Sequence, residues 1–251
     1  MATEVNKLSY KEKVKIIELV SEHSKQRIPT AVTIQGNSIE EYIKLIYVAK
    51  SNNANWVILQ PLLKENTTDK DCYIFFNKLI PYVGNTLVGI QNAKEYLGAG
   101  VISKDVIKLY KKFPNFRVMK AESSSIFMGE EIKQYPKDLR VFNGRGGQEI
   151  VDNFILGCKG IVPALENADT FLKIYQYTKL KNYNKVHEEY MKILPSIVFV
   201  MQSISTLICY GKRICAYRMG AKKMFDRKPC LLTTNYGLKK SKKIARELGS
   251  F

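Results

Sequence analysis

The chain has 251 residues, of which 45% are hydrophobic and 25% charged; this is ordinary for a globular protein and allows one α/β barrel or two small domains. No apolar run reaches the roughly 20 residues that span a membrane, and the N-terminal sequence has no signal-peptide pattern, so we expect a cytoplasmic protein without a membrane partner. Forty basic and 23 acidic residues give a net charge of +17, but the lysines are spread along the chain, so we do not expect a nucleic-acid partner.

The first two thirds of the chain alternate between helical and strand-like segments. Residues 8–25 have helical spacing, and Ser9 followed by Glu12 is the capping-box signature of a helix start. We expect Ser103 to cap a later helix in the same way. The pattern predicts strands at 28–34, 56–59, 87–91, 116–120, 139–142 and 160–163, and further helices at 38–52, 69–83, 103–113, 124–134 and 147–158.

This alternation predicts βαβ units and a parallel sheet. After residue 164 the strand pattern ends, and 167–180, 184–219 and 238–248 are helical in pattern. We therefore predict an α/β barrel domain over 1–165 and a helical C-terminal segment over 166–251. A closed barrel of this type needs eight strands, so an open sheet of six parallel strands is the alternative.

The cysteines and histidines form no recognisable metal or disulfide pattern. The five cysteines are odd in number and include no CxxC pair, which indicates free thiols in a reducing compartment. His23 and His187 lie in polar, helix-like stretches and are not placed for a catalytic triad or a metal. We therefore expect neither a metal nor another cofactor.

Lys120 ends the apolar run 116–120, and a lysine at the end of a buried strand is unusual. Removing an ammonium group from water favours the free amine, which can attack a ketone and form a Schiff base. In a barrel, the C-terminal ends of the strands are where the chemistry takes place. Lys120 is therefore a candidate covalent catalyst, and a lysine that simply reaches water is the alternative.

Further candidates lie near Lys120 or end the preceding strand. Glu122 is two residues after Lys120 on the same face of an extended segment, where it can hold the ammonium charged or shuttle a proton; a plain surface charge is the alternative. Gln91 and Asn92 are suited to hydrogen-bond a substrate or a catalytic water, although Gln91 cannot act as a general acid.

The segment 143–147 follows the next predicted strand. Its glycines permit close approach of the backbone, and Arg145 suits a substrate carboxylate. We expect Asn143, Gly144 and Arg145 to bind substrate, whereas a simple tight turn is the alternative. Glu166 and Asn167 are weaker candidates.

Several motifs occur in the order of a known family: 8–12 with Ser9 and Glu12, 27–41 with its Gly-Asn-Ser stretch, Lys120, and the segment 157–163 with Gly157 and Gly160. They resemble the dihydrodipicolinate synthase / N-acetylneuraminate lyase family of class I aldolases. The resemblance implies a (β/α)8 barrel with a C-terminal helical domain and a homo-dimer or homo-tetramer. It also implies that Lys120 forms a Schiff base with pyruvate or a related 2-keto acid.

The chain departs from this family in ways that concern its chemistry. The family's first strand has no counterpart, so we expect a barrel that lacks the first strands. Gln91 stands where the family has a tyrosine, and Tyr96 where true dihydrodipicolinate synthases bind a carboxylate with arginine; we count Tyr96 among the substrate-binding candidates. We therefore expect a divergent Schiff-base lyase or aldolase. The alternatives are a family member that binds a keto acid without turnover, and an anion- or nucleic-acid-binding protein suggested only by charge.

Overall fold

The structure is a computed structural model that describes residues 3–221 and 223–251. The chain divides into two compact units. The sheet unit consists of Leu8–Asn143 and Leu156–Lys159, and the helical unit consists of Met1–Lys7, Gly144–Ile155 and Gly160–Phe251. The predicted division at residue 165 stays a prediction.

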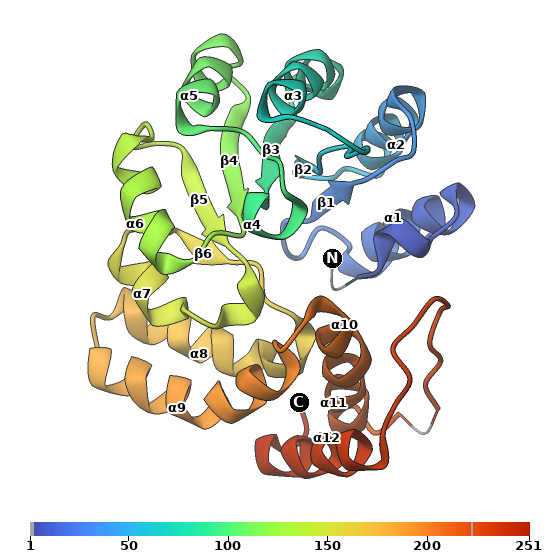
Figure 1. Cartoon of the computed structure of the whole chain (residues 1–251), viewed down its shortest axis with the longest axis vertical. Helices are drawn as coiled ribbons and strands as arrows, with labels where there is room; N and C mark the ends of the chain where they lie inside the picture. Colours follow the sequence, from blue (N-terminus) through green and yellow to red (C-terminus); the bar gives the residue numbers. More distant parts are fainter. Residues whose placement is uncertain (1–2, 222) are drawn as a thin grey trace. The chain divides into compact units, whose positions relative to one another are not determined.

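Parallel strands in chain order form the sheet (Figure 1). The strands of the sheet unit are β1 (Ala31–Ile34), β2 (Trp56–Leu59), β3 (Leu87–Asn92), β4 (Phe116–Ala121) and β5 (Arg140–Asn143). A short β6 (Gly160–Ile161) ends the order β1-β2-β3-β4-β5-β6. The predicted α/β fold with a parallel sheet is thus confirmed as a half-barrel sheet, whereas the loss of the family's first strands stays a prediction.

Helices alternate with the strands of the sheet unit. They are α1 (Tyr10–Ser24), α2 (Ile39–Ser51), α3 (Asp69–Val83), α4 (Lys94–Leu97), α5 (Ser103–Lys112) and α6 (Ser125–Gln134). The predicted capping box of α1 is present, because Ser9 and Glu12 each accept a hydrogen bond from the other's backbone N–H. The predicted cap at Ser103 is wrong: Ser103 is already the first residue inside α5, and Ile102 takes the cap position without a side-chain bond.

The hydrophobic core of the sheet unit lies between one face of the sheet and these helices. Strand residues in this core are Val57, Leu59, Val88, Ile90, Met119, Ala121 and Val141, packed in one cluster with α3 residues such as Phe76 and Leu79. Because successive side chains of a strand point to opposite faces, the residues between them point to the other, inner face. Gln91 and Lys120 therefore share the inner face.

The inner face of the sheet is concave. The rings of Trp56 on β2 and Phe142 on β5 have centroids 5.3 Å apart, although two strands lie between β2 and β5. In a flat sheet the backbones of such strands would be about 14 Å apart, at about 4.8 Å per strand. The two aromatic side chains meet because the sheet curves as a barrel wall does.

The helical unit contains six α-helices within the described residues. They are α7 (Ile150–Ile155), α8 (Ala168–Lys179), α9 (Tyr183–Val200), α10 (Ile204–Thr206), α11 (Lys212–Arg218) and α12 (Asn235–Leu248). One-turn segments also occur: η1 (Val5–Lys7), η2 (Arg145–Gly147), η3 (Leu165–Asn167) and the π-helical η4 (Leu207–Gly211).

Two predicted helices of this unit are wrong in extent. The predicted helix 184–219 is interrupted after Val200, because Ser203 and Thr206 form a capping box that starts a new helix. The predicted helix 147–158 is shortened to α7, because Gly147 and Gly157 have φ values of 81° and 102°, which a right-handed helix excludes.

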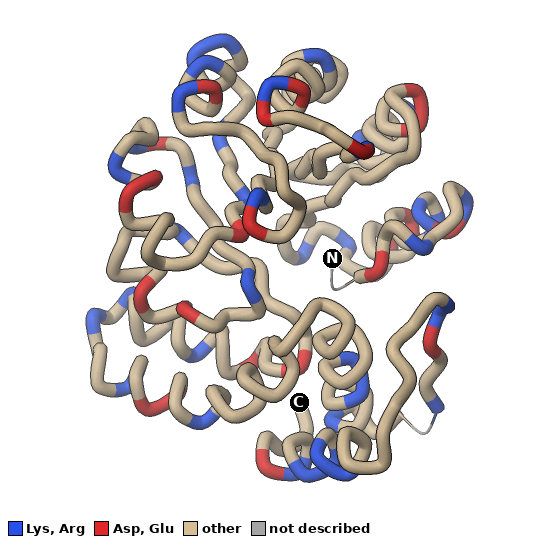
Figure 2. Tube along the Cα trace, viewed as in Figure 1, with Lys and Arg blue, Asp and Glu red and all other residues tan. Residues whose placement is uncertain are grey.

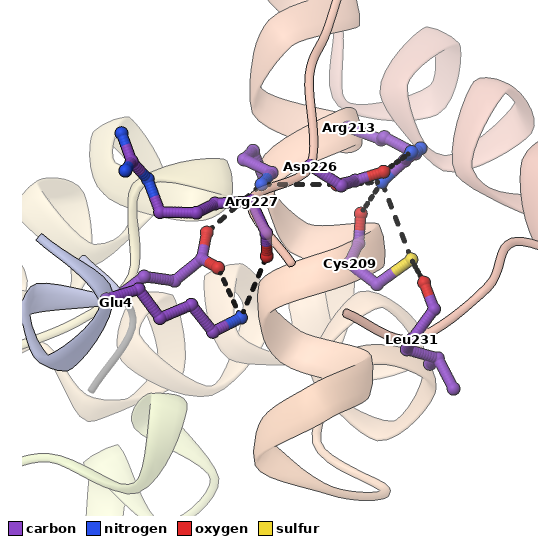
Figure 3. A network of polar contacts seen from close by, with 8 residues as sticks. Glu4, Cys209, Arg213, Asp226, Arg227 and Leu231 are labelled. Carbon is purple, nitrogen blue, oxygen red and sulfur yellow. Dashed lines mark hydrogen bonds and ion pairs between the residues drawn. The ribbon is translucent and has the colours of Figure 1, made fainter. Parts of the chain in front are cut away.

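Inside the helical unit, ion pairs through Lys212 of α11 connect Glu4, just before η1, with Asp226 in the segment before α12 (Figure 3). Glu4 pairs with Lys7 at 2.8 Å and with Lys212 at 3.1 Å. Asp226 pairs with Lys212 at 3.2 Å and receives two hydrogen bonds from the guanidinium of Arg213. These contacts fix two chain segments that lack long helices of their own.

Lys and Arg occur in both units, as the sequence predicts (Figure 2). No single described helix is long and apolar enough to cross a membrane; α9 and Ile204–Arg218 reach that length and composition only together, and they are bent by 107°.

Candidate active site

Lys120 lies near the C-terminal end of β4 and is only 7% exposed. In the register of the sheet it stands beside Gln91 on β3 and beside Phe142 on β5. The apolar strand carries the lysine into the inner face, where water has little access to the amino group. This is the position predicted for a covalent catalyst at the carboxyl end of a barrel strand.

Lys120 shares this buried place with a carboxylate and an amide. Nζ of Lys120 lies 3.6 Å from Oε1 of Glu122 and donates a long hydrogen bond of 3.5 Å to Oε1 of Gln91. Nε2 of Gln91 in turn donates to Oε1 of Glu122 at 3.5 Å. Glu122 and Gln91 are 4% and 0% exposed, so the ion pair offsets part of the cost of burying both charges.

The local backbone explains how Glu122 reaches the lysine. The N–H of Glu122 donates to the carbonyl of Asn92 at 3.0 Å, so strand pairing continues past the end of β4. In extended backbone, residues two apart face the same side. Lys120 and Glu122 therefore both face inward, as the spacing predicts.

Asn92 and Asn143 are buried and hold neighbouring backbone. Both polar ends of the Asn92 side chain bind Val101, one to its carbonyl and one to its N–H, each at 2.9 Å. The side chain of Asn92 therefore holds the loop before α5 in place. Asn143 is fully buried and donates to the carbonyl of Ser123 at 2.9 Å, which fixes the segment after Lys120.

The other residues predicted to bind substrate are Tyr96, Gly144 and Arg145. Tyr96 lies half-buried on the short helix α4 of the sheet unit. Gly144 and Arg145 belong to the helical unit at the start of η2, where Arg145 pairs with Glu149 at 3.0 Å. Arg145 has a φ of 50°, an uncommon conformation for a residue other than glycine. Their roles in binding stay predictions.

Glu166 and Asn167, the weaker candidates, lie in η3 of the helical unit and are buried. Burial raises the pKa of Glu166 to about 7. Among the described residues no cluster of three or more His, Cys, Asp or Glu side chains has the geometry to hold a metal ion.

One residue that the sequence reasoning missed is Gln60, the first residue after β2. It is 9% exposed, and its backbone carbonyl accepts a hydrogen bond of 2.9 Å from the hydroxyl of the buried Tyr42. A polar residue directly after a predicted barrel strand is itself a signal, because the carboxyl ends of these strands form the site.

Comparison with known proteins identifies the family. The model of the dihydrodipicolinate synthetase family matches residues 2–247. The chain belongs to this family. At the level of the family, membership supports a class I aldolase or lyase enzyme. The 4-hydroxy-tetrahydrodipicolinate synthase of Sulfurihydrogenibium sp. (strain YO3AOP1) is 22% identical over 199 residues, which cover 77% of this chain and 67% of that protein.

Solved structures of dihydrodipicolinate synthetase family members share the fold. The 4-hydroxy-tetrahydrodipicolinate synthase of Methylacidiphilum fumariolicum SolV has a TM-score of 0.87 at 16% identity, covering 98% of this chain and 81% of that one. YagE, a prophage protein of the dihydrodipicolinic acid synthase family from E. coli K12 in complex with pyruvate, has a TM-score of 0.88 at 14% identity, covering 98% and 84%.

Proposed function

We propose that this protein is a Schiff-base-forming lyase or aldolase that acts on pyruvate or a related 2-keto acid, with Lys120 as the nucleophile. The observation that carries the proposal is the buried amino group of Lys120 at the end of β4, 3.6 Å from the carboxylate of Glu122. Family membership supports the same chemistry, and YagE was crystallised with pyruvate.

The proposed reaction begins when the ammonium of Lys120 gives a proton to the carboxylate of Glu122. The free amine attacks the ketone carbon, and the ketone oxygen leaves as water, which gives an iminium. The iminium withdraws electrons, so a proton or a carbon–carbon bond at the adjacent carbon can break. Hydrolysis of the iminium then returns the lysine and releases the keto acid.

Gln91 is a positioning residue in the proposed reaction. Its amide contacts both Nζ of Lys120 and Oε1 of Glu122 and holds the two groups together. An amide does not donate a proton as an acid, unlike the tyrosine that the family has at this position. Glu122 is therefore assigned the proton transfers.

The second candidate function is a family member that binds a keto acid without turnover. The amide at Gln91, in place of an acidic hydroxyl, is the observation that favours it. The two functions differ in whether a bound keto acid loses the proton next to its ketone. Exchange of the methyl protons of pyruvate for deuterium in D2O, followed by mass spectrometry, separates them.

The first test is trapping with borohydride and pyruvate, read by intact mass. We expect an adduct on the wild-type protein and none on Lys120→Ala. Lys111→Ala is the matched control, because Lys111 is an exposed lysine of the same unit on α5, and this variant should keep the adduct. A folded wild-type protein without an adduct overturns the proposal.

The homo-oligomer, dimer or tetramer, is part of the same proposal. It rests on family membership, and a neighbour described as a monomeric dihydrodipicolinate synthase variant shows that the assembly differs within the fold. Sedimentation equilibrium of the full chain decides it: a mass near the 28.8 kDa of one chain contradicts the proposed oligomer.

A further inference from the structure

Three glutamines take equivalent positions on neighbouring strands of the sheet unit. Gln35 follows the last residue of β1, Gln60 follows the last residue of β2, and Gln91 lies on β3. In the register, Ile34 pairs with Leu59 and Leu59 pairs with Ile90. The next residue of each strand therefore places Gln35, Gln60 and Gln91 side by side.

This row continues to the reactive lysine. Gln91 is the register partner of Lys120, so Gln60 is one strand away from Gln91 and Gln35 two strands away. The ladder extends as far as Gln60, because its N–H donates to the carbonyl of Ile34 at 3.0 Å. The four residues Gln35, Gln60, Gln91 and Lys120 thus form one transverse row across the sheet.

The row faces inward. The residues that precede the three glutamines, Ile34, Leu59 and Ile90, all belong to the core against the outer helices. Since neighbouring residues of a strand point to opposite faces, the glutamines point to the concave inner face. Tyr42 holds the backbone of Gln60 in this position through its bond to the Gln60 carbonyl.

Two of the three amides have unused hydrogen-bonding capacity. The side-chain oxygens of Gln35 and Gln60 are buried, and no donor from the described residues binds either one. Gln91, in contrast, uses its amide on Lys120 and Glu122. A buried polar atom without a partner is costly to stability. Two such atoms in the row that ends at Lys120 therefore point to a ligand that supplies the partner.

We propose that Gln35 and Gln60 are specificity-determining residues that bind hydroxyl groups on the carbon chain of a 2-keto acid whose ketone reacts with Lys120. This proposal rests on the proposed function. An amide offers one acceptor and two donors, which suits hydroxyls. The amide carries no charge, so Gln35 and Gln60 cannot neutralise a second carboxylate on the substrate. The far end of the substrate is therefore neutral and hydroxylated.

The test compares three six-carbon 2-keto acids in borohydride trapping on the full chain. They are 2-keto-3-deoxygluconate, which is hydroxylated, 2-ketohexanoate, which has no hydroxyl, and 2-ketoadipate, which has a second carboxylate. The amine of Lys120 attacks the ketone carbon and the ketone oxygen leaves as water; hydride from borohydride then reduces the resulting iminium to a stable amine. A pyruvate-sized adduct from the hydroxylated acid also counts, because cleavage leaves pyruvate on Lys120.

We expect the hydroxylated acid to reach half-maximal trapping at about tenfold lower concentration than the other two, the effect of one or two hydrogen bonds. Gln60→Met keeps the size of the side chain and removes its hydrogen bonds, and it should abolish most of this preference. Gln35→Met is a second variant at the next position of the row. Gln134→Met, at an exposed glutamine of α6, is the control and should retain the preference.

The outcomes separate this proposal from the one on which it rests. A wild-type protein that traps pyruvate but shows no preference for the hydroxylated acid overturns the role of the two glutamines alone. The same holds if Gln60→Met and Gln35→Met, shown to be folded by circular dichroism, retain the full preference. A protein that traps no keto acid overturns the proposed function and this inference with it.

Discussion

Gln91 and Lys120 are direct partners in the parallel register of β3 and β4, and Oε1 of Gln91 accepts a hydrogen bond from Nζ of Lys120 at 3.5 Å. The amide occupies the side of the lysine that faces β3, while Glu122 approaches from further along β4. In the proposed reaction the proton of the Lys120 ammonium passes to Glu122, which makes both groups neutral and leaves neither as an unpaired buried charge.

The carboxylate of Glu122 should be required for turnover more than for adduct formation. Glu122→Gln keeps the shape of the side chain and removes the proton acceptor, so deuterium exchange into pyruvate should slow by about 100-fold. Borohydride trapping at Lys120 should persist at long incubation. Glu130→Gln, at an exposed carboxylate of α6 that pairs with Lys133, is the control. An unchanged exchange rate in Glu122→Gln would contradict the assigned role.

The close approach of β3 and β4 depends on Gly89. A Cβ at this position would lie 2.9 Å from Cβ of Val118 and 3.1 Å from its carbonyl oxygen. Gly89→Ala should therefore destabilise the protein by about 2 kcal/mol, measured by urea unfolding, and slow trapping because β4 carries Lys120. The double variant with Val118→Gly lacks Cβ and Cγ1 of residue 118, two of the three atoms that the new Cβ would meet. Part of the overlap is then relieved, so the two losses should not add. Strictly additive losses would refute this explanation.

The unpartnered amide oxygen of Gln60 should cost stability. Gln60→Met replaces it with an apolar side chain of similar size at a 9% exposed position, so the free energy of unfolding should rise by about 1 kcal/mol or more. Gln134→Met on the surface of α6 should change it by less than about 0.5 kcal/mol. A clear loss of stability in Gln60→Met would show that the amide has a partner within the fold.

Stability should fall with rising pH because of Glu166. Burial raises the pKa of this carboxyl from 4.5 to about 7, so between these values the folded state holds a proton that the unfolded state has lost. The stabilising contribution is complete below pH 4.5 and is lost as the pH rises to about 7, with a total of up to about 3 kcal/mol. Glu166→Gln should remove this slope in unfolding experiments at pH 5 to 8. The same slope in the variant would rule out Glu166 as its source.

The guanidinium of Arg213 and the carboxylate of Asp226 should stabilise the helical unit (Figure 3). The hydrogen bonds from Arg213 are the largest cause that lowers the pKa of Asp226 below 3.8. The contribution is therefore present above the unfolded pKa of the carboxyl and is lost as the pH falls through the lowered value. Asp226→Asn should cost about 2 kcal/mol at pH 7, measured by urea unfolding. No change at pH 7 would show that the network contributes nothing.

Local signals predicted much of the sheet unit. The bounds of β2 and α3 agree with the apolar run 56–59 and the helical pattern 69–83, because the start of α3 is set by a capping box that Thr68 and Asp71 form within one turn. The pattern failed at 184–219. The sequence there stays apolar and helix-like, although the chain turns after Val200 and Ser203 caps a new helix. Hydrophobic periodicity cannot distinguish one long helix from two bent ones.

Local patterns likewise predicted only part of the candidate site. Lys120 and Glu122 were predicted to share a face, because alternation along a strand is a local property. Asn92 was also placed at the site, but its side chain points to the opposite face from Gln91 and binds Val101. A position near a strand end therefore indicates a candidate site residue. Whether its side chain points to the inner or the outer face depends on which residues of that strand alternate inward.

Local sequence patterns predicted the alternation of strands and helices, the capped start of α1 and the unusual lysine at the end of an apolar strand, since each depends on residues a few positions apart. The row of Gln35, Gln60, Gln91 and Lys120 was decided only by the tertiary structure. The strands that carry these residues are separated by helices, and their relative register comes from backbone pairing between segments about 25 to 30 residues apart. No local pattern states that register, so side chains distant in the chain become neighbours only when the sheet forms.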